Sequence, residues 1–157
     1  MAAKGMDPAA TLMDLIARSQ VDAVLVGDSA AMVVHGYPTT LAATVRLMAL
    51  HTRAVAQAAD GKFLVADLPF LSFRKGILAA MKAVGALMTS GAQAVKLEGV
   101  DGHEDVIRQI VGSGVPVMGH IGLTPQSVNQ FGGFRVQGRS DLEAATLRRQ
   151  ANVTASS

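Results

Sequence analysis

The sequence predicts an α/β fold built around a parallel sheet. Four apolar runs alternate with segments of helical composition, and a helical segment comes first. The first three runs are nearly continuous rather than alternating, which is typical of strands buried on both faces. Alternation of this kind indicates βαβ units joined by right-handed crossovers. The 157 residues suit one domain by the usual size of domains.

The individual elements follow from local patterns. Strands are predicted at residues 21–28, 62–69, 92–99 and 115–122. Helices are predicted at 11–20, 40–59, 75–91 and 103–114, from apolar residues at helical spacing. Thr39 or Thr40 would cap the second helix, and Gly91 would end the third.

Composition excludes several classes of protein. The net charge is +2, and the chain has no Trp and one Tyr, so a nucleic-acid surface is not expected. There is no Cys, which excludes disulfides and thiolate metal sites and is consistent with a reducing cytoplasm. Neither a signal-peptide core nor a run of ~18 apolar residues is present. We therefore expect a cytoplasmic protein that binds no membrane.

Each predicted strand ends on a residue that can do chemistry, and these are Asp28, Asp67, Glu98 and His120. Their separations of 39, 31 and 22 residues each correspond to one βα unit. In parallel α/β folds, the loops at the carboxyl ends of the strands build the active site. The four side chains are therefore expected to converge on one edge of the sheet.

Three converging carboxylates repel one another unless a cation neutralises them. Mg²⁺ prefers oxygen ligands and keeps water or substrate in its shell, so Asp28, Asp67 and Glu98 are predicted as direct or water-mediated Mg²⁺ ligands. Mn²⁺ would suit the same site. The alternative is that these acids cap helices or pair with Lys and Arg.

Other polar residues near the strand ends are candidates for the same site. Lys96 lies two residues before Glu98, so both point to the same side of the strand. Ser29 could cap a helix or bind ligand, and His120 is expected to contact substrate. Among the other histidines, His35 could line the mouth of the site, His51 is expected in packing or an interface, and His103 in solvent.

Several stretches closely resemble one family, with matches that run from about residue 10 to Arg139. They are VLVGDSAAMVVHGYPTTLAAT, VADLPF, AVKLEG and VPVMGHIGLTPQSVNQFGGFRVQGR. The family is the ketopantoate (3-methyl-2-oxobutanoate) hydroxymethyltransferases. The resemblance implies a (β/α)8 TIM barrel, usually assembled as a decamer. It also implies transfer of a hydroxymethyl group from 5,10-methylenetetrahydrofolate to 3-methyl-2-oxobutanoate, giving 2-dehydropantoate for pantothenate and coenzyme A synthesis.

The resemblance also implies roles for particular residues. Asp28, Asp67 and Glu98 match the Mg²⁺-site acids of the family, and Asp28, Ser29, Asp67 and Lys96 match residues that contact the keto acid. If a helix begins at Asp28–Ser29, its backbone N–H groups could hold the substrate carboxylate. The long segment 122–139 would cover the site or contact another subunit.

The sequence departs from the family pattern at both ends. MAAKGMDPAAT stands where the first barrel strand is expected, and the family's general-base glutamate falls beyond the last residue, so no catalytic base is assigned. We expect a partial TIM-barrel transferase domain at 1–139, with about four βα units, and a divergent or truncated tail without a strand at 140–157. Turnover by this chain alone is expected to be weak or absent.

Two other functions remain open at this point. One is a Mg²⁺-dependent lyase or mutase acting on 2-oxo acids, of the phosphoenolpyruvate mutase type, which would use similar strand-end acids. The other is a non-catalytic remnant that only self-associates.

Overall fold

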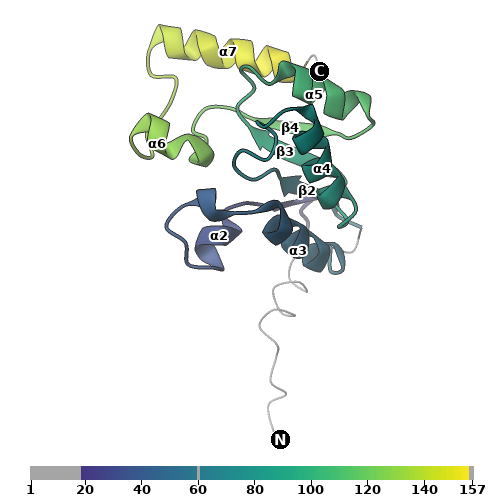
Figure 1. The fold of residues 1–157 in the computed structure, drawn as a ribbon. Helices are drawn as coiled ribbons and strands as arrows, with labels where there is room; N and C mark the ends of the chain where they lie inside the picture. The colour runs from purple at the N-terminus through teal and green to yellow at the C-terminus, as the bar shows by residue number, and fades with distance from the viewer. Residues whose placement is uncertain (1–18, 60, 156–157) are drawn as a thin grey trace, which may run out of the picture.

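The computed structural model describes residues 19–59 and 61–155, and its centre is a four-stranded parallel sheet (Figure 1). The strands are β1 (Ala23–Val26), β2 (Phe63–Asp67), β3 (Ala94–Glu98) and β4 (Val117–His120). They lie side by side in the order of the sequence, and all three pairings are parallel. The predicted α/β class is confirmed, and each strand falls inside its predicted run. Four successive βα units in this order are consistent with part of a (β/α)8 barrel.

Three long helices cover one face of this sheet (Figure 1). They are α3 (Val45–Ala56), α4 (Ile77–Met88) and α5 (Glu104–Gly112), and α4 packs between the other two. Shorter elements follow β1 and β4: α2 (Ala30–Val33), the 3-10 helices η1 (Thr40–Ala42) and η2 (Pro125–Ser127), and α6 (Val128–Phe131). The last helix, α7 (Asp141–Ala155), packs near β4.

The two faces of the sheet differ in chemistry because successive side chains along a strand point to opposite sides. The helix-covered face supplies core residues such as Leu64, Ala66, Val95 and Leu97, all buried. The next residues along the same strands, including Asp67, Lys96 and Glu98, face the other way. The polar groups of the sheet therefore lie opposite the helices, toward what would be the inside of a barrel.

The prediction of a single helix at 40–59 is wrong for the first part of that range. The structure has η1 at Thr40–Ala42, a break, and then α3 from Val45. The cap is Thr44, in an extended conformation, and its Oγ1 accepts a hydrogen bond from the Leu47 N–H at 3.1 Å. The expected cap at Thr39 or Thr40 is therefore wrong, and Thr44 caps the helix instead.

Two other boundaries also differ from expectation. The predicted terminal glycine of the third helix, Gly91, lies three residues beyond Met88, where α4 ends. The segment 122–139, expected as a loop, contains η2 and α6. The helix predicted at 11–20 lies outside the described residues except for Ser19 and Gln20, which are not helical.

The segment 140–157 contains α7 and, in its described part, no strand. Arg149 of α7 binds the Asp101 carboxylate with both terminal nitrogens, at 2.8 and 3.0 Å. This exposed ion pair joins α7 to the loop that follows β3. The domain boundary at residue 139 stays a prediction.

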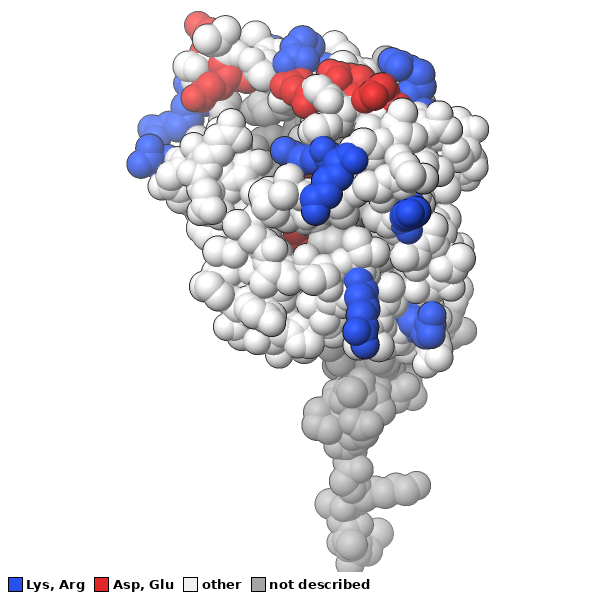
Figure 2. Space-filling model, viewed as in Figure 1, with Lys and Arg blue, Asp and Glu red and all other residues white. Residues whose placement is uncertain are grey.

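Charged side chains gather over the end of the molecule where α5 and α7 lie, while the surface below them is mostly uncharged (Figure 2). None of the helices in the described ranges has both the length and the apolar character that a membrane span needs.

Candidate active site

The carboxyl ends of the four strands bring together the residues that the sequence singled out. Asp67, Glu98 and His120 are the last residues of β2, β3 and β4, and Asp28 lies two residues after β1. Register pairs Asp67 with Lys96 and Glu98 with His120 on neighbouring strands. We call Asp28, Asp67, Lys96, Glu98 and His120 the strand-end cluster. All but His120 are buried.

Lys96 is the centre of this cluster. Its Nζ donates to Asp67 Oδ1 at 2.5 Å and to Glu98 Oε1 at 3.5 Å. The expectation that Lys96 and Glu98 share one side of the strand is confirmed by this contact. The lysine side chain points into the cluster and not along the surface toward solvent, so its ammonium compensates buried negative charge.

Glu98 is held from three directions. Its Oε1 lies 3.1 Å from His120 Nδ1, and its Oε2 accepts the backbone N–H of Gln126 at 2.9 Å. Arg74 Nη2 donates to the main-chain oxygen of the same glutamate at 2.7 Å. His120 is the partly exposed member of the cluster and lies at its rim.

Asp28 and Asp67 are linked directly. The Asp28 N–H donates to Asp67 Oδ2 at 3.0 Å, while Asp28 Oδ2 accepts from Gln126 Nε2 at 2.8 Å. This geometry corrects one expectation: the backbone N–H of Asp28 is committed to Asp67 and does not point to a substrate carboxylate. Ser29 is the N-cap residue of α2, but its side chain makes no capping hydrogen bond and the residue is exposed.

The acids carry more negative charge than the single lysine can balance. Burial raises the pKa of Asp28 to about 6; the hydrogen bond from Gln126 opposes this rise, and the charges of Asp67 and Glu98 add to it. Burial also raises the pKa of Asp67, against the opposing effect of Lys96. When all three carboxylates are ionised, two negative charges remain in excess, which favours binding of a cation.

The donor set suits Mg²⁺ in chemistry, although the acids are not arranged as a finished metal site. Across residues 19–59 and 61–155, no group of three or more His, Asp or Glu side chains forms a ready-made site for a metal ion. Mg²⁺ commonly takes only one or two carboxylates and completes its shell with water and substrate. Asp28 and Asp67 supply hard oxygen ligands within a cluster whose three acids outnumber its one lysine, and so fit that requirement.

Three histidines outside the cluster also have defined surroundings. His35 and His51 approach each other, with their Nε2 atoms 2.8 Å apart, so His35 is directed to α3 and not to the mouth of the site. The expectation that His103 is solvated is wrong. It is the N-cap residue of α5, half-buried, with its ring edge-on to Phe73 at 5.5 Å, and burial lowers the pKa of its imidazole.

Sequence reasoning missed two residues that contact the cluster, Gln126 and Arg74. Gln126 lies in the quoted stretch GHIGLTPQ, next to His120, but a glutamine in a loop has no periodic signal. Arg74 follows β2 in a segment without regular structure and stacks over the ring of Phe73 at 5.1 Å. The buried partners of both residues become evident only from the fold.

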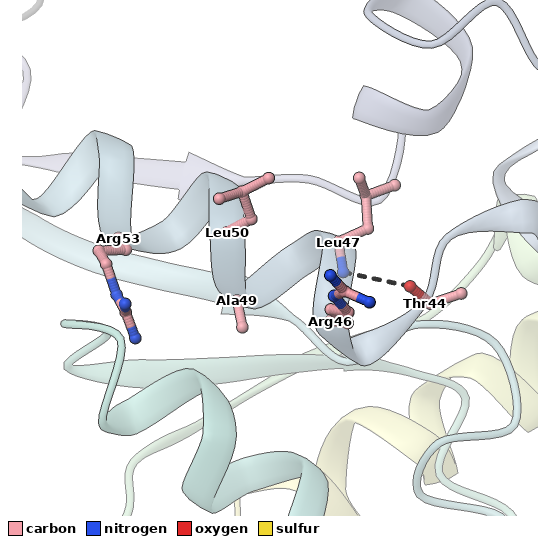
Figure 3. A pocket seen from close by; sticks show the side chains of 6 residues that line it. All are labelled: Thr44, Arg46, Leu47, Ala49, Leu50 and Arg53. Atoms are coloured by element: carbon pink, nitrogen blue, oxygen red, sulfur yellow. Dashed lines mark hydrogen bonds between the residues drawn. The ribbon is translucent and has the colours of Figure 1, made fainter.

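Several hollows lie outside the cluster, and two of them bear on where the site lies. One, of about 320 Å³, borders it at the ends of β3 and β4, and its lining includes Arg74, Asp101, Thr124 and Ser127. The other, of about 410 Å³, lies on α3 and is lined by Thr44, Arg46, Leu47, Ala49, Leu50 and Arg53 (Figure 3). Neither hollow is lined by a strand-end acid, and we place the candidate site at the strand ends, where the buried acids gather.

The chain matches one family model and is similar in sequence to several named proteins. The model of a family described as ketopantoate hydroxymethyltransferase matches residues 8–157. A protein of Bdellovibrio bacteriovorus named 3-methyl-2-oxobutanoate hydroxymethyltransferase is 58% identical over 145 residues, covering 88% of this chain and 55% of the relative. Proteins of the same name from Coxiella burnetii and Legionella pneumophila (strain Lens) are each 51% identical, covering 90% and 88% of this chain and 53% of each relative. The chain thus spans about half the length of these curated relatives.

Proposed function

The chain belongs to the ketopantoate hydroxymethyltransferase family, and on that premise we propose that it provides the metal- and keto-acid-binding part of such an enzyme. The reaction is transfer of a hydroxymethyl group from 5,10-methylenetetrahydrofolate to C3 of 3-methyl-2-oxobutanoate, giving 2-dehydropantoate for pantothenate synthesis. The observation that carries the proposal is the buried strand-end cluster, in which Lys96 contacts Asp67 and Glu98, and the backbone N–H of Asp28 donates to Asp67.

We assign cation binding to Asp28 and Asp67, with Glu98 acting directly or through water. Bound Mg²⁺ would polarise the keto oxygen of the substrate as a Lewis acid and so ease loss of the proton from C3. Burial of the two aspartates keeps water away from their charges, which strengthens their attraction for a cation.

The remaining cluster residues would orient the substrate. Lys96 supplies a positive charge beside the anionic keto acid and is held in place by Asp67 and Glu98. Ser29, exposed at the start of α2, can donate its hydroxyl to the substrate carboxylate. His120, at the rim and bonded to Glu98, can contact the substrate from the side of β4.

The rest of the proposal comes with the family resemblance. Folate would deliver the one-carbon unit, and water would supply the hydroxyl oxygen of the transferred group. We assign removal of the C3 proton to none of the described residues. A cytoplasmic location and assembly into a homo-oligomer, a decamer in the family, belong to the same proposal.

A thermal melt tests the proposal directly. The purified chain would be melted alone, with Mg²⁺, with 3-methyl-2-oxobutanoate, and with both. A ligand that binds only the folded state raises the melting temperature by mass action. We expect the largest rise with both ligands together, because the keto acid and the ion would share one site.

Two variants make this test specific. Asp28→Asn removes one expected ligand and should abolish the rise. Asp105→Asn makes the same chemical change at an exposed position in the first turn of α5 and should keep it. A wild-type chain whose melting temperature responds to neither ligand would contradict the proposed function.

A further inference from the structure

Gln126 has been given no role so far, yet it forms hydrogen bonds to two acids of the strand-end cluster, Asp28 and Glu98. It lies in η2, is 4% exposed, and donates three hydrogen bonds. Its Nε2 donates to Asp28 Oδ2 at 2.8 Å and to the Leu68 carbonyl oxygen at 3.0 Å, and its backbone N–H donates to Glu98 Oε2 at 2.9 Å. A single residue of the β4 loop thus fastens the chain segments that follow β1 and β2 and the end of β3.

The orientation of the Gln126 amide is fixed by these partners. Both groups that face Nε2 are acceptors, a carboxylate and a carbonyl, so exchanging the nitrogen and oxygen would set acceptor against acceptor. The amide must therefore present its NH₂ group to Asp28 and Leu68. Its Oε1 then points away from both of them.

That oxygen is buried and has no hydrogen-bond partner among the described residues. A buried acceptor without a donor costs roughly 1–3 kcal/mol, so it is retained where something else satisfies it. A carbonyl oxygen accepts only from a donor, which here means an O–H or N–H group that none of the residues 19–59 and 61–155 provides. Water or a hydroxyl of a bound molecule would meet that need.

We infer that Gln126 is a positioning residue of the candidate site, which fixes the carboxylates of Asp28 and Glu98 relative to one another and holds Oε1 ready for an O–H donor of the bound ligand shell. The inference rests on the proposed function for the identity of that ligand. The contacts to Asp28, Leu68 and Glu98 cross 98, 58 and 28 residues of sequence, so this one residue links the two acids, through its side-chain amide to Asp28 and through its backbone N–H to Glu98.

Two substitutions test the hydrogen bonds of the Gln126 side chain while keeping its size nearly unchanged. Gln126→Met keeps the length of the side chain and removes the side-chain donor Nε2 and the side-chain acceptor Oε1. Gln126→Glu keeps acceptor oxygens and removes the donor to Asp28. The matched control is Gln130→Met, the same change at an exposed position four residues later.

The first measurement is hydrogen–deuterium exchange of the chain without ligands, followed in peptides that contain residues 27–34. We expect exchange there to become at least tenfold faster in both Gln126 variants and to stay unchanged in the control. Equal exchange in wild type and Gln126→Met would overturn the inference, whatever the chain binds.

The second measurement is Mg²⁺ affinity by titration calorimetry. We expect Gln126→Met to bind Mg²⁺ at least tenfold more weakly than wild type, and Gln130→Met within twofold of it. If wild type binds Mg²⁺ and Gln126→Met binds it equally well, Gln126 is only structural and the inference fails while the proposed function stands. If wild type binds no Mg²⁺ but exchange responds as expected, the positioning role stands and the proposed function fails.

Discussion

Burial of the Asp28 carboxylate lowers the stability of the folded chain when the group is ionised, which is the form that would bind a cation. Its folded-state pKa of about 6 lies above the ordinary value of 3.8, mainly because burial disfavours the charged form. The folded chain therefore holds a proton at Asp28 that the unfolded chain releases. Stability from this residue is fully present below about pH 3.8 and is lost as the pH rises through about 6.

The first prediction concerns this pH dependence in the absence of metal. Relative to Asp28→Asn, the melting temperature of the wild type should fall between about pH 4 and pH 6.5. At pH 7, the Asn variant should melt a few degrees higher, since it carries no charge to bury. Melts across that pH range check the difference, and parallel curves for the two proteins would contradict it. Mg²⁺ affinity should rise through the same range, because the proton and the metal compete for one carboxylate.

Lys96 stabilises the folded chain, whereas ionised Asp28 destabilises it, because the ammonium group of Lys96 pairs with two buried carboxylates. Lys96→Met keeps most of the side-chain volume and leaves Asp67 and Glu98 without their ammonium partner. Breaking a buried pair in this way costs roughly 3–5 kcal/mol in unfolding free energy. Urea unfolding at pH 7 measures this loss.

The control for that prediction is Lys82→Met on α4, an exposed lysine, which should change the unfolding free energy by less than about 0.5 kcal/mol. If Lys96→Met cost as little as the control, the ion pairs around Lys96 would not be stabilising. The Lys96 variant should also lose the effect of the keto acid on melting.

The residues of the site could be predicted to very different extents. The convergence of Asp28, Asp67 and Glu98 could be predicted because the end of a buried parallel strand is a recognisable place in a sequence, and all such ends meet at one edge. Gln126 was not found, since its partners lie 28 to 98 residues away and nothing local marks it. The Asp28 N–H was assigned wrongly because its partner, Asp67, belongs to a different βα unit.

At the scale of single elements, one glycine inside α4 and one just after it differ in whether a side chain could be added. Gly91, just beyond the helix, has a φ of 109°, and an added Cβ would lie 2.5 Å from the Cβ of Ala56 on α3. Gly85, inside the helix, has nothing within 4 Å of an added Cβ. One glycine is required by backbone conformation and close packing of two helices, and the other is not.

The substitution Gly91→Ala should therefore destabilise the chain by about 2–4 kcal/mol, through both strain and overlap. Gly85→Ala should stabilise it by up to about 1 kcal/mol, because alanine favours helix. Denaturant unfolding of the two variants and the wild type measures both the expected loss and the expected gain in unfolding free energy. A Gly91→Ala chain as stable as wild type would show that α3 and α4 do not pack this closely.

Strands were easier to locate from sequence than helix boundaries. The apolar runs contain β1 to β4 with an excess of one to two residues at their ends, since burial on both faces leaves a continuous signal. Helix starts depend on single hydrogen bonds, and the sequence prediction placed the cap at Thr39 or Thr40 and not at Thr44. The Thr44 cap wins because an extended residue there lets its Oγ1 reach the Leu47 N–H.

For the molecule as a whole, the outstanding feature is a sheet with one face covered by helices, in which β1 and β4 form the two edges and pair with no further strand among residues 19–59 and 61–155. On the other face, Leu25 of β1 and Met118 of β4 remain 48% and 45% exposed. Open edges and apolar side chains of this kind promote association between molecules. The position of both residues on the edge strands makes this face the expected region of contact.

We therefore predict that the chain associates with itself in a concentration-dependent way, and that the double variant Leu25→Ser/Met118→Ser reduces this association. Both side chains are half exposed, so the unfolding free energy should fall by only about 1 kcal/mol. Sedimentation velocity over a range of concentrations measures the association. The matched control is Leu50→Ser on α3, an exposed leucine in the hollow of Figure 3. If the control reduces association and the double variant does not, contact occurs through α3 instead.

The order of the strands has a consequence for how the molecule is made. Because β1, β2, β3 and β4 lie in the sheet in the order of the sequence, each strand leaving the ribosome can dock on the one before it, and the sheet grows at a single edge. The charges arrive in a matching sequence: Asp28 and Asp67 come first, Lys96 next, and Glu98 two residues later. The nascent chain thus contains Lys96 before it contains Glu98, its third buried acid. At no stage of synthesis are all three carboxylates present without the lysine.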